Sequence, residues 1–134
     1  MKILLFISAI LFPILVVGQV PTQSENYIKT TIYRDVNSAN PVHSITYFDG
    51  LGRPIQQIAN AQSNSGKDIV TPIEYDAIGR QVNEYLPFVS SQNTMAYTSG
   101  SVLVPALVSQ YQTQYGDANP YSEKLLKSRH STEF

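Results

Sequence analysis

Phe48-Asp49-Gly50-Leu51-Gly52-Arg53-Pro54-Ile55 and Tyr75-Asp76-Ala77-Ile78-Gly79-Arg80-Gln81-Val82 are the two stretches of the sequence that decide the fold. They align without a gap at an offset of 27 residues, as aromatic, Asp, small, aliphatic, Gly, Arg, any residue, aliphatic. A repeat at such a period indicates a repetitive architecture in which each unit is one supersecondary element.

The spacing within each unit predicts a tight reversal of the chain. Asp49 and Asp76 open the turns, because an aspartate accepts hydrogen bonds from backbone N–H groups two residues on and satisfies donors that the reversal leaves unpaired. Gly52 and Gly79 lie where the chain must take a positive φ, a conformation that costs other residues roughly 1 kcal/mol or more. Each unit is therefore expected to be one β-hairpin.

The remaining positions of the unit have expected roles in packing. The aliphatic residues before the glycines, Leu51 and Ile78, are expected to tuck under the turns. The arginines that begin the return strands, Arg53 and Arg80, are long enough to lie along the sheet and meet a carboxylate on a neighbouring rung. The carboxylates in reach are Asp49, Glu74 and Asp76.

The rest of the chain predicts a mainly β fold with one short amphipathic helix. Residues 26–36, 42–48, 53–58, 69–75 and 80–86 have the Tyr, Ile, Val and Thr content of strands, with loops at 37–41 and 62–68. Residues 87–100 are predicted to be irregular, and residues 121–126 to begin another strand. A helix is predicted over 105–115, with Pro105 in its first turn, Gly116 as its C-cap, and one face formed by Leu107, Val108, Tyr111 and Tyr115.

The first 18 residues read as a secretory signal peptide. Met1-Lys2 is positively charged, residues 3–17 are apolar apart from Ser8 and Pro13, and Val16-Val17-Gly18 suits a cleavage site. The apolar run is shorter than the roughly 20 residues that span a bilayer, so no membrane span is expected after cleavage. We expect a β domain over residues 19–126, a disordered tail over 127–134, and a secreted or cell-surface location.

Composition excludes some classes of function. Without residues 1–18 the chain has 8 Lys and Arg against 10 Asp and Glu, a formal net charge of −2. No basic patch exists for phosphate groups, so no nucleic-acid partner is expected. The chain has no cysteine, so no disulfide contributes and stability must come from burial or from neighbouring chain.

The Tyr-Asp-x-x-Gly-Arg core resembles the YD repeat of Rhs and teneurin-type proteins. Over residues 25–126 the chain resembles, more narrowly, the N-terminal domain of unknown function of exported bacterial Rhs/YD-repeat proteins. The matching blocks are Glu25-Asn26-Tyr27-Ile28, residues 47–54, Lys67-Asp68-Ile69-Val70, Glu74-Tyr75-Asp76, Glu84-Tyr85-Leu86-Pro87 and Asn119-Pro120-Tyr121-Ser122-Glu123. Phe48 departs from the pattern, where the repeat has Tyr.

The resemblance implies a structural role. In such families many hairpins wind into a hollow β-shell, so the partners would be further YD repeats of the same or a split polypeptide. Family members continue into more repeats and often a C-terminal toxin, whereas this sequence stops at Phe134; the resemblance therefore implies a truncated product or a fragment. The repeat core consists of Phe48, Asp49, Gly52, Arg53, Tyr75, Asp76, Gly79 and Arg80.

Some residues suggest alternatives to a scaffold: an enzyme, a metal site or a binding module. Asp49 and Asp76 could form a glycosidase pair, but their equivalent positions in two repeats favour one structural explanation, and no enzyme activity or cofactor is expected. His43 and His130 lack metal-ligand spacing. The nine tyrosines leave open a secreted module that binds a cell-surface glycan or protein through exposed rings; rings packed inside would favour the scaffold.

Overall fold

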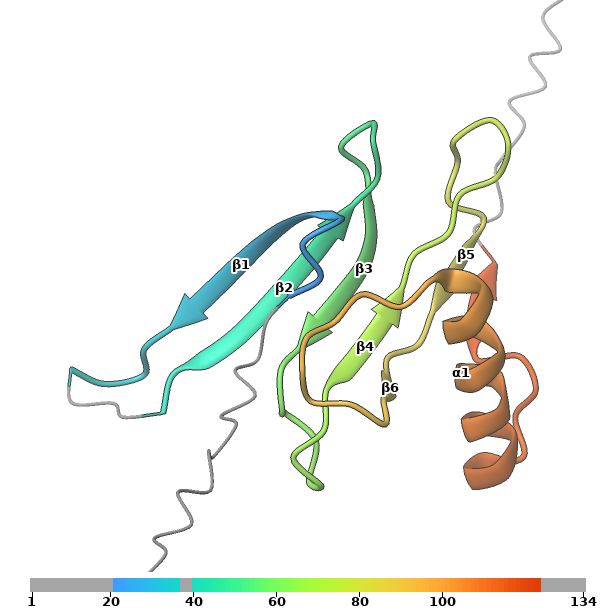
Figure 1. The fold of residues 1–134 in the computed structure, drawn as a ribbon. Helices are drawn as coiled ribbons and strands as arrows, with labels where there is room; N and C mark the ends of the chain where they lie inside the picture. The colour runs from blue at the N-terminus through green and yellow to red at the C-terminus, as the bar shows by residue number, and fades with distance from the viewer. Residues whose placement is uncertain (1–20, 37–39, 124–134) are drawn as a thin grey trace, which may run out of the picture.

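The computed structural model describes residues 21–36 and 40–123, which form two antiparallel sheets and one helix (Figure 1). The predicted mainly β fold class is confirmed. In chain order the elements are β1 (Asn26–Ile32), β2 (Val42–Phe48), β3 (Pro54–Ala59), β4 (Ile69–Pro72), β5 (Asn83–Tyr85), β6 (Phe88–Val89), α1 (Gly100–Tyr115) and β7 (Tyr121–Glu123).

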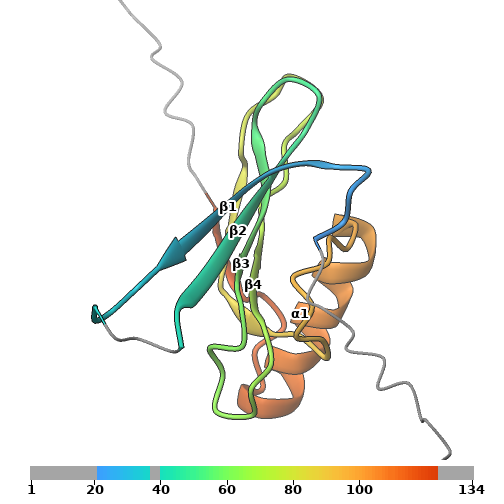
Figure 2. The same ribbon diagram turned by 60° about the vertical axis from the view of Figure 1, so that its left-hand side comes forward.

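The larger sheet has five strands in the order β1-β2-β3-β4-β6, and the smaller one pairs β5 with β7. Neighbours in the larger sheet are antiparallel, and the register shifts once, between Tyr47 and Phe48, beside the first turn. An irregularity at that point increases the local twist of the ribbon. Figure 2 shows the sheet nearly edge-on with α1 on one side of it.

The core lies between the larger sheet and the layer formed by α1 and the segment that leads into it. Inward-facing side chains of the strands alternate with more exposed ones, as the period of a strand requires. The buried apolar residues are Ile45, Tyr47, Ile58, Val70, Tyr85, Phe88, Met95, Leu103 and Leu107. Within the described residues, no helix is long and apolar enough to cross a membrane.

The helix begins earlier than the sequence predicted. It starts at Gly100, after Ser99 as N-cap, so Pro105 lies inside the helix and not in its first turn. The added turn places Leu103 in the core beside Leu107, and this burial offsets part of the cost of a proline inside the helix. Gly116 has a φ of 71° and is the C-cap, as predicted. Tyr115 is 72% exposed, so it does not belong to the packed face.

The second repeat unit is not the continuous β-hairpin that was predicted, because its return segment 80–86 does not pair with β4. β4 pairs with β3 and β6, whereas β5, on the far side of the second turn, pairs with β7. The cause is Pro72 at the end of β4. Backbone groups alternate in direction along a strand, and Ile73 donates to the carbonyl of Ile55 in the β3 arm, so the position before it faces away from β3. Proline has no N–H to offer there, and the ladder ends.

The first strand is shorter than predicted. It ends at Ile32, and Val36, predicted to lie in it, is fully exposed. The predicted strand 121–126 is observed over Tyr121–Glu123, the part of it that the structure describes. The predicted signal peptide, part of the loop 37–41 and the predicted tail 127–134 lie outside the described residues.

One polar side chain, Asp68, joins three segments inside the fold. Its carboxylate is 2% exposed. It accepts hydrogen bonds from the Asn60 side-chain amide at 2.8 Å, the Ala61 N–H at 2.9 Å and the Met95 N–H at 2.9 Å. The backbone of Asp68 also bonds Ser90 and Gln92. A carboxylate surrounded by donors therefore fixes the segment after β6 against the sheet, and that segment leads into α1.

We predict that Asp68→Ala destabilises the protein by about 3 kcal/mol or more, because it leaves buried donors without acceptors. Asp68→Asn, which keeps one acceptor oxygen and nearly the same volume, should cost less. Urea unfolding followed by circular dichroism measures both. Equal midpoints for the two variants would contradict the role given to the carboxylate.

Candidate functional site: the paired turns

The two turns have the same internal hydrogen bonds. Asp49 Oδ1 accepts from the N–H groups of Leu51 and Arg53, both at 2.9 Å. Asp76 Oδ1 accepts from Ile78 at 3.0 Å and Arg80 at 2.8 Å. In each turn the arginine Nε bonds the other carboxylate oxygen, at 2.7 Å in the first and 2.8 Å in the second. The predicted reversal is confirmed at both positions.

These donors change the acidity of the two aspartates. The pKa of Asp49 is lowered, first by the backbone N–H of Arg53, then by its side chain and the N–H of Leu51, while partial desolvation opposes the shift. The pKa of Asp76 is lowered by the same set of groups from Arg80 and Ile78. Both carboxylates are therefore held in the ionised form, which suits an acceptor of hydrogen bonds and does not suit a general acid.

The glycines occupy the conformation expected of them. Gly52 has a φ of 76° and Gly79 a φ of 82°. Their surroundings differ. A Cβ on Gly52 would meet nothing within 4 Å, whereas a Cβ on Gly79 would lie 2.7 Å from Nη1 of Arg53. A side chain at position 79 would therefore have to displace the end of the Arg53 side chain, besides adopting a positive φ.

The first turn packs against the second through repeat residues of both. The guanidinium carbon of Arg53 lies 4.4 Å from the centre of the Tyr75 ring, a cation–π distance. The Tyr75 hydroxyl donates to the carbonyl of Pro54 at 3.0 Å. Together with the contact at Gly79, these interactions fasten one turn to the next, and the two turns project side by side from the same end of the sheet (Figures 1 and 2). We call this set of contacts the turn clasp.

Three expectations about the turns are corrected. Leu51 and Ile78 do not tuck under the turns; they are 79% and 76% exposed. Each arginine pairs with the aspartate of its own turn and not with one on a neighbouring rung. Phe48 takes no part in the turn clasp, since the ring that is used belongs to Tyr75.

The two aspartates border neighbouring surface depressions. Asp49 lines one and Asp76 lines the other, while Glu74 and Tyr75 line both. Each aspartate is paired with the arginine of its own turn. Within the part of the chain that the structure describes, no group of three or more His, Asp or Glu residues could hold a metal ion. His43 bonds Thr31 Oγ1 at 3.0 Å across the first ribbon.

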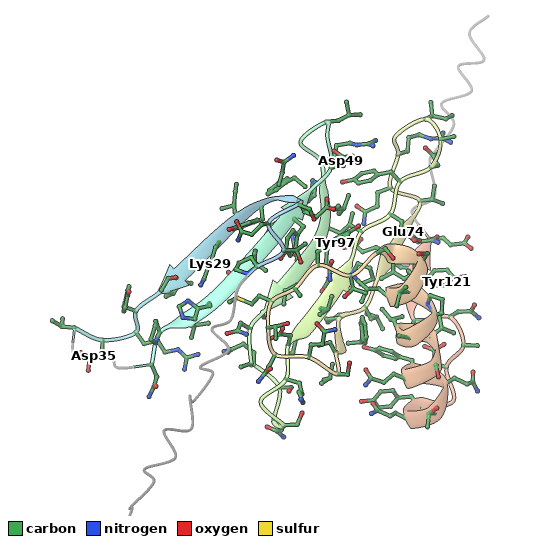
Figure 3. The ribbon with its side chains drawn as sticks, viewed as in Figure 1. Lys29, Asp35, Asp49, Glu74, Tyr97 and Tyr121 are labelled. Carbon is green, nitrogen blue, oxygen red and sulfur yellow. The ribbon has the colours of Figure 1, made fainter. Side chains whose placement is uncertain are left out.

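The sequence did not predict the role of Glu74. One of its carboxylate oxygens accepts from the Tyr85 hydroxyl at 2.7 Å, and the other would lie 2.9 Å from a Cβ on Gly100, at the start of α1 (Figure 3). A carboxylate at that place is stabilised by the dipole of the helix. Burial raises the pKa of Tyr85, and the bond to Glu74 adds to the shift. Glu74 thereby connects the strand arm before the second turn to β5 and lies beside the start of α1.

Most tyrosine rings pack against the core. Tyr47 and Tyr85 are buried, and Tyr27, Tyr97, Tyr111 and Tyr121 pack on the core cluster. Neighbouring rings meet at angles between 44° and 65°, so they form no flat platform. Tyr33 and Tyr115 are largely exposed, and they lie on separate elements.

A model of the family described as a domain of unknown function (DUF6443) matches residues 21–130. No curated protein and no solved structure matches this chain.

We predict that Gly52→Ala costs about 1 kcal/mol, from the strain of positive φ alone. Gly79→Ala should cost more, because it must also displace Arg53 from Tyr75. Unfolding in urea measures both. In an Arg53→Ala background the two substitutions should cost the same, and a difference that persists there would mean that Arg53 is not the cause.

We predict that acid weakens the turns. Because the folded pKa of both aspartates lies below the ordinary value of 3.8, their contribution is fully present above that value and is lost as the pH falls through the folded pKa. Unfolding free energy measured between about pH 2 and about pH 7 should fall at the acid end. Asp49→Asn together with Asp76→Asn should lower stability at neutral pH and reduce the acid-dependent loss; an unchanged acid-dependent loss would contradict this account.

Proposed function

This chain belongs to the DUF6443 family of domains of unknown function, and we propose, from the resemblance of its two turns to YD repeats, that it is a non-enzymatic structural segment of a secreted Rhs/YD-repeat surface or toxin-shell protein. In this role the paired turns are rungs of a wall built from repeated units. Its partners are further YD repeats, from the same or a split polypeptide. The hypothesis treats the repeat core as an assembly device and not as a site of chemistry.

The turn clasp is the observation that supports the proposal most strongly. Arg53 of the first unit binds the ring of Tyr75 in the second, and Tyr75 binds the backbone after Arg53. The residues shared by the two units are thus the ones that join them. An assembly device has this property, whereas residues kept for a substrate would face an open cavity.

The second turn presents the same chemistry to a further unit. Arg80 is held by Asp76 as Arg53 is held by Asp49. Its side chain is 50% exposed, against 35% for Arg53, and no aromatic ring of the described residues lies over it. The ring of a third aromatic-Asp-x-x-Gly-Arg turn would find in Arg80 the cation that the Tyr75 ring finds in Arg53.

The positions of the tyrosines favour the scaffold over a glycan- or protein-binding module. Their rings pack on the core or on each other at steep angles, and sugar-binding platforms need exposed rings on one face. Export of the chain is proposed on the sequence of residues 1–18 alone.

The proposal is tested by adding a third unit. A copy of residues 69–86 is joined to the C-terminus of the full chain by a flexible linker, which raises its effective concentration at the second turn. We predict that the fusion is more stable to urea than the chain alone, by roughly 0.5–1 kcal/mol if the cation–π contact forms. The NMR signals of the Arg80 guanidinium should shift upfield under the added ring.

Two control variants make the test specific. Replacing the tyrosine of the added copy by serine should abolish both effects. Arg80→Ala should remove the gain in the fusion, while in the unfused chain it breaks only a half-exposed ion pair of small value. If the added copy leaves Arg80 unshifted, the assembly role of the turns is wrong.

A further inference from the structure

The two edges of the larger sheet differ in whether the described residues bond their outward-pointing backbone groups. At one edge β6 is only two residues long, and the amide of Gln110 from α1 closes it. Gln110 Oε1 accepts from the Val89 N–H at 3.1 Å, and its Nε2 donates to the Val89 carbonyl at 3.2 Å. A side chain here takes the place of a neighbouring strand, which protects the edge from pairing with another chain.

The other edge, β1, has no such protection among the described residues. It is seven residues long, contains no proline and pairs with β2 without a bulge. No described strand lies on its outer side, and Figure 1 shows it bordering the sheet. Six of its seven residues are exposed, so it is held by the ladder to β2 and by little else.

The direction of the backbone groups in β1 follows from one hydrogen bond. Asn60 donates to the His43 carbonyl, so His43 faces β3. Backbone direction alternates along a strand, and the even-numbered residues of β2 therefore face β1. Their partners in β1 are also even-numbered. The N–H and C=O groups of Tyr27, Lys29 and Thr31 consequently point outward.

We propose that β1 pairs in antiparallel fashion with β1 of a second copy of this chain, with Thr30 opposite Thr30 on the two-fold axis. Among the symmetric registers that bring the outward-pointing groups together, three have the axis at Lys29, Thr30 or Thr31. Centring on Lys29 sets two like charges opposite each other, and centring on Thr31 sets Ile28 opposite Arg34. Centring on Thr30 sets Ile28 opposite Ile32 on both sides of the axis, and Lys29 opposite Thr31.

The register centred on Thr30 places residues of the same kind opposite each other across the two strands. Ile28 and Ile32 are 62% and 55% exposed, and in this register each covers the other at a position without hydrogen bonds, where side chains of antiparallel strands are closest. Tyr33, which is 69% exposed, lies opposite Tyr27. The self-complementary pattern makes a second copy, and not an unrelated strand, the expected occupant of this edge. The inference goes beyond the scaffold role, because it uses a different part of the sheet from the turns.

The absence of cysteine allows a direct test in the full chain. At the two-fold axis the Cα atoms of Thr30 and its copy would be about 4.5 Å apart, within the range that a disulfide bridges. Thr30→Cys should therefore form a covalent dimer rapidly in a glutathione redox buffer. Ile28→Cys is the matched control, on the same strand and face; its copy would be about 13 Å away, and it should remain largely monomeric.

A second measurement does not depend on the new thiol. The unsubstituted chain should show a dimer fraction that rises with concentration in sedimentation experiments. Thr31→Pro removes an outward N–H and keeps the backbone ladder to β2, although it also loses the side-chain bond to His43. It should reduce the dimer fraction. A chain that sediments as a monomer at every concentration overturns the proposal. Equal cross-linking of the Thr30→Cys and Ile28→Cys variants also overturns the proposal. It would indicate random collision, or that β1 pairs with another protein's strand.

Discussion

The fastening of Arg53 by Asp49 is the interaction on which the arrangement of the turns depends. One carboxylate oxygen of Asp49 accepts a hydrogen bond from the arginine Nε at 2.7 Å, and the other oxygen accepts from N–H groups of the same turn. An arginine is otherwise flexible, and ordering it costs entropy. Because its own turn has already ordered it, Arg53 presents a fixed flat face to Tyr75. The internal bonds of one turn thus prepare the contact with the next.

The repeat was informative because its function in the fold is local. Asp, Gly and Arg act on backbone groups a few residues away, and so the sequence predicted the hydrogen bonds of Asp49 and Asp76 and the positive φ of Gly52 and Gly79. It could not predict that Tyr75 meets Arg53, since this contact joins residues in different units. The spacing of a repeat specifies what is repeated, and the packing between repeats is set by the sheet.

Two features that the sequence did not predict depend on distant partners. Asp68 lies in a polar stretch that looks solvated, and its burial follows from Met95 and Gln92, which come from a segment that itself looked irregular. The pairing of β5 with β7 depends on Pro72, whose effect is evident only once its missing N–H is known to face away from β3. In both cases the sequence identifies the residue but does not specify the direction in which its groups point.

The turn clasp is directional, because the arginine of the first unit meets the tyrosine of the second unit. Contacts between unlike surfaces have no inherent end, so a chain of such units can continue until something stops it. Pairing of β1 with its own copy would join like surfaces and close after one addition. If both contacts form, the turns join unlike surfaces and allow further units to add, whereas β1 joins like surfaces and stops at a dimer. One region of the sheet therefore cannot take over the role of the other.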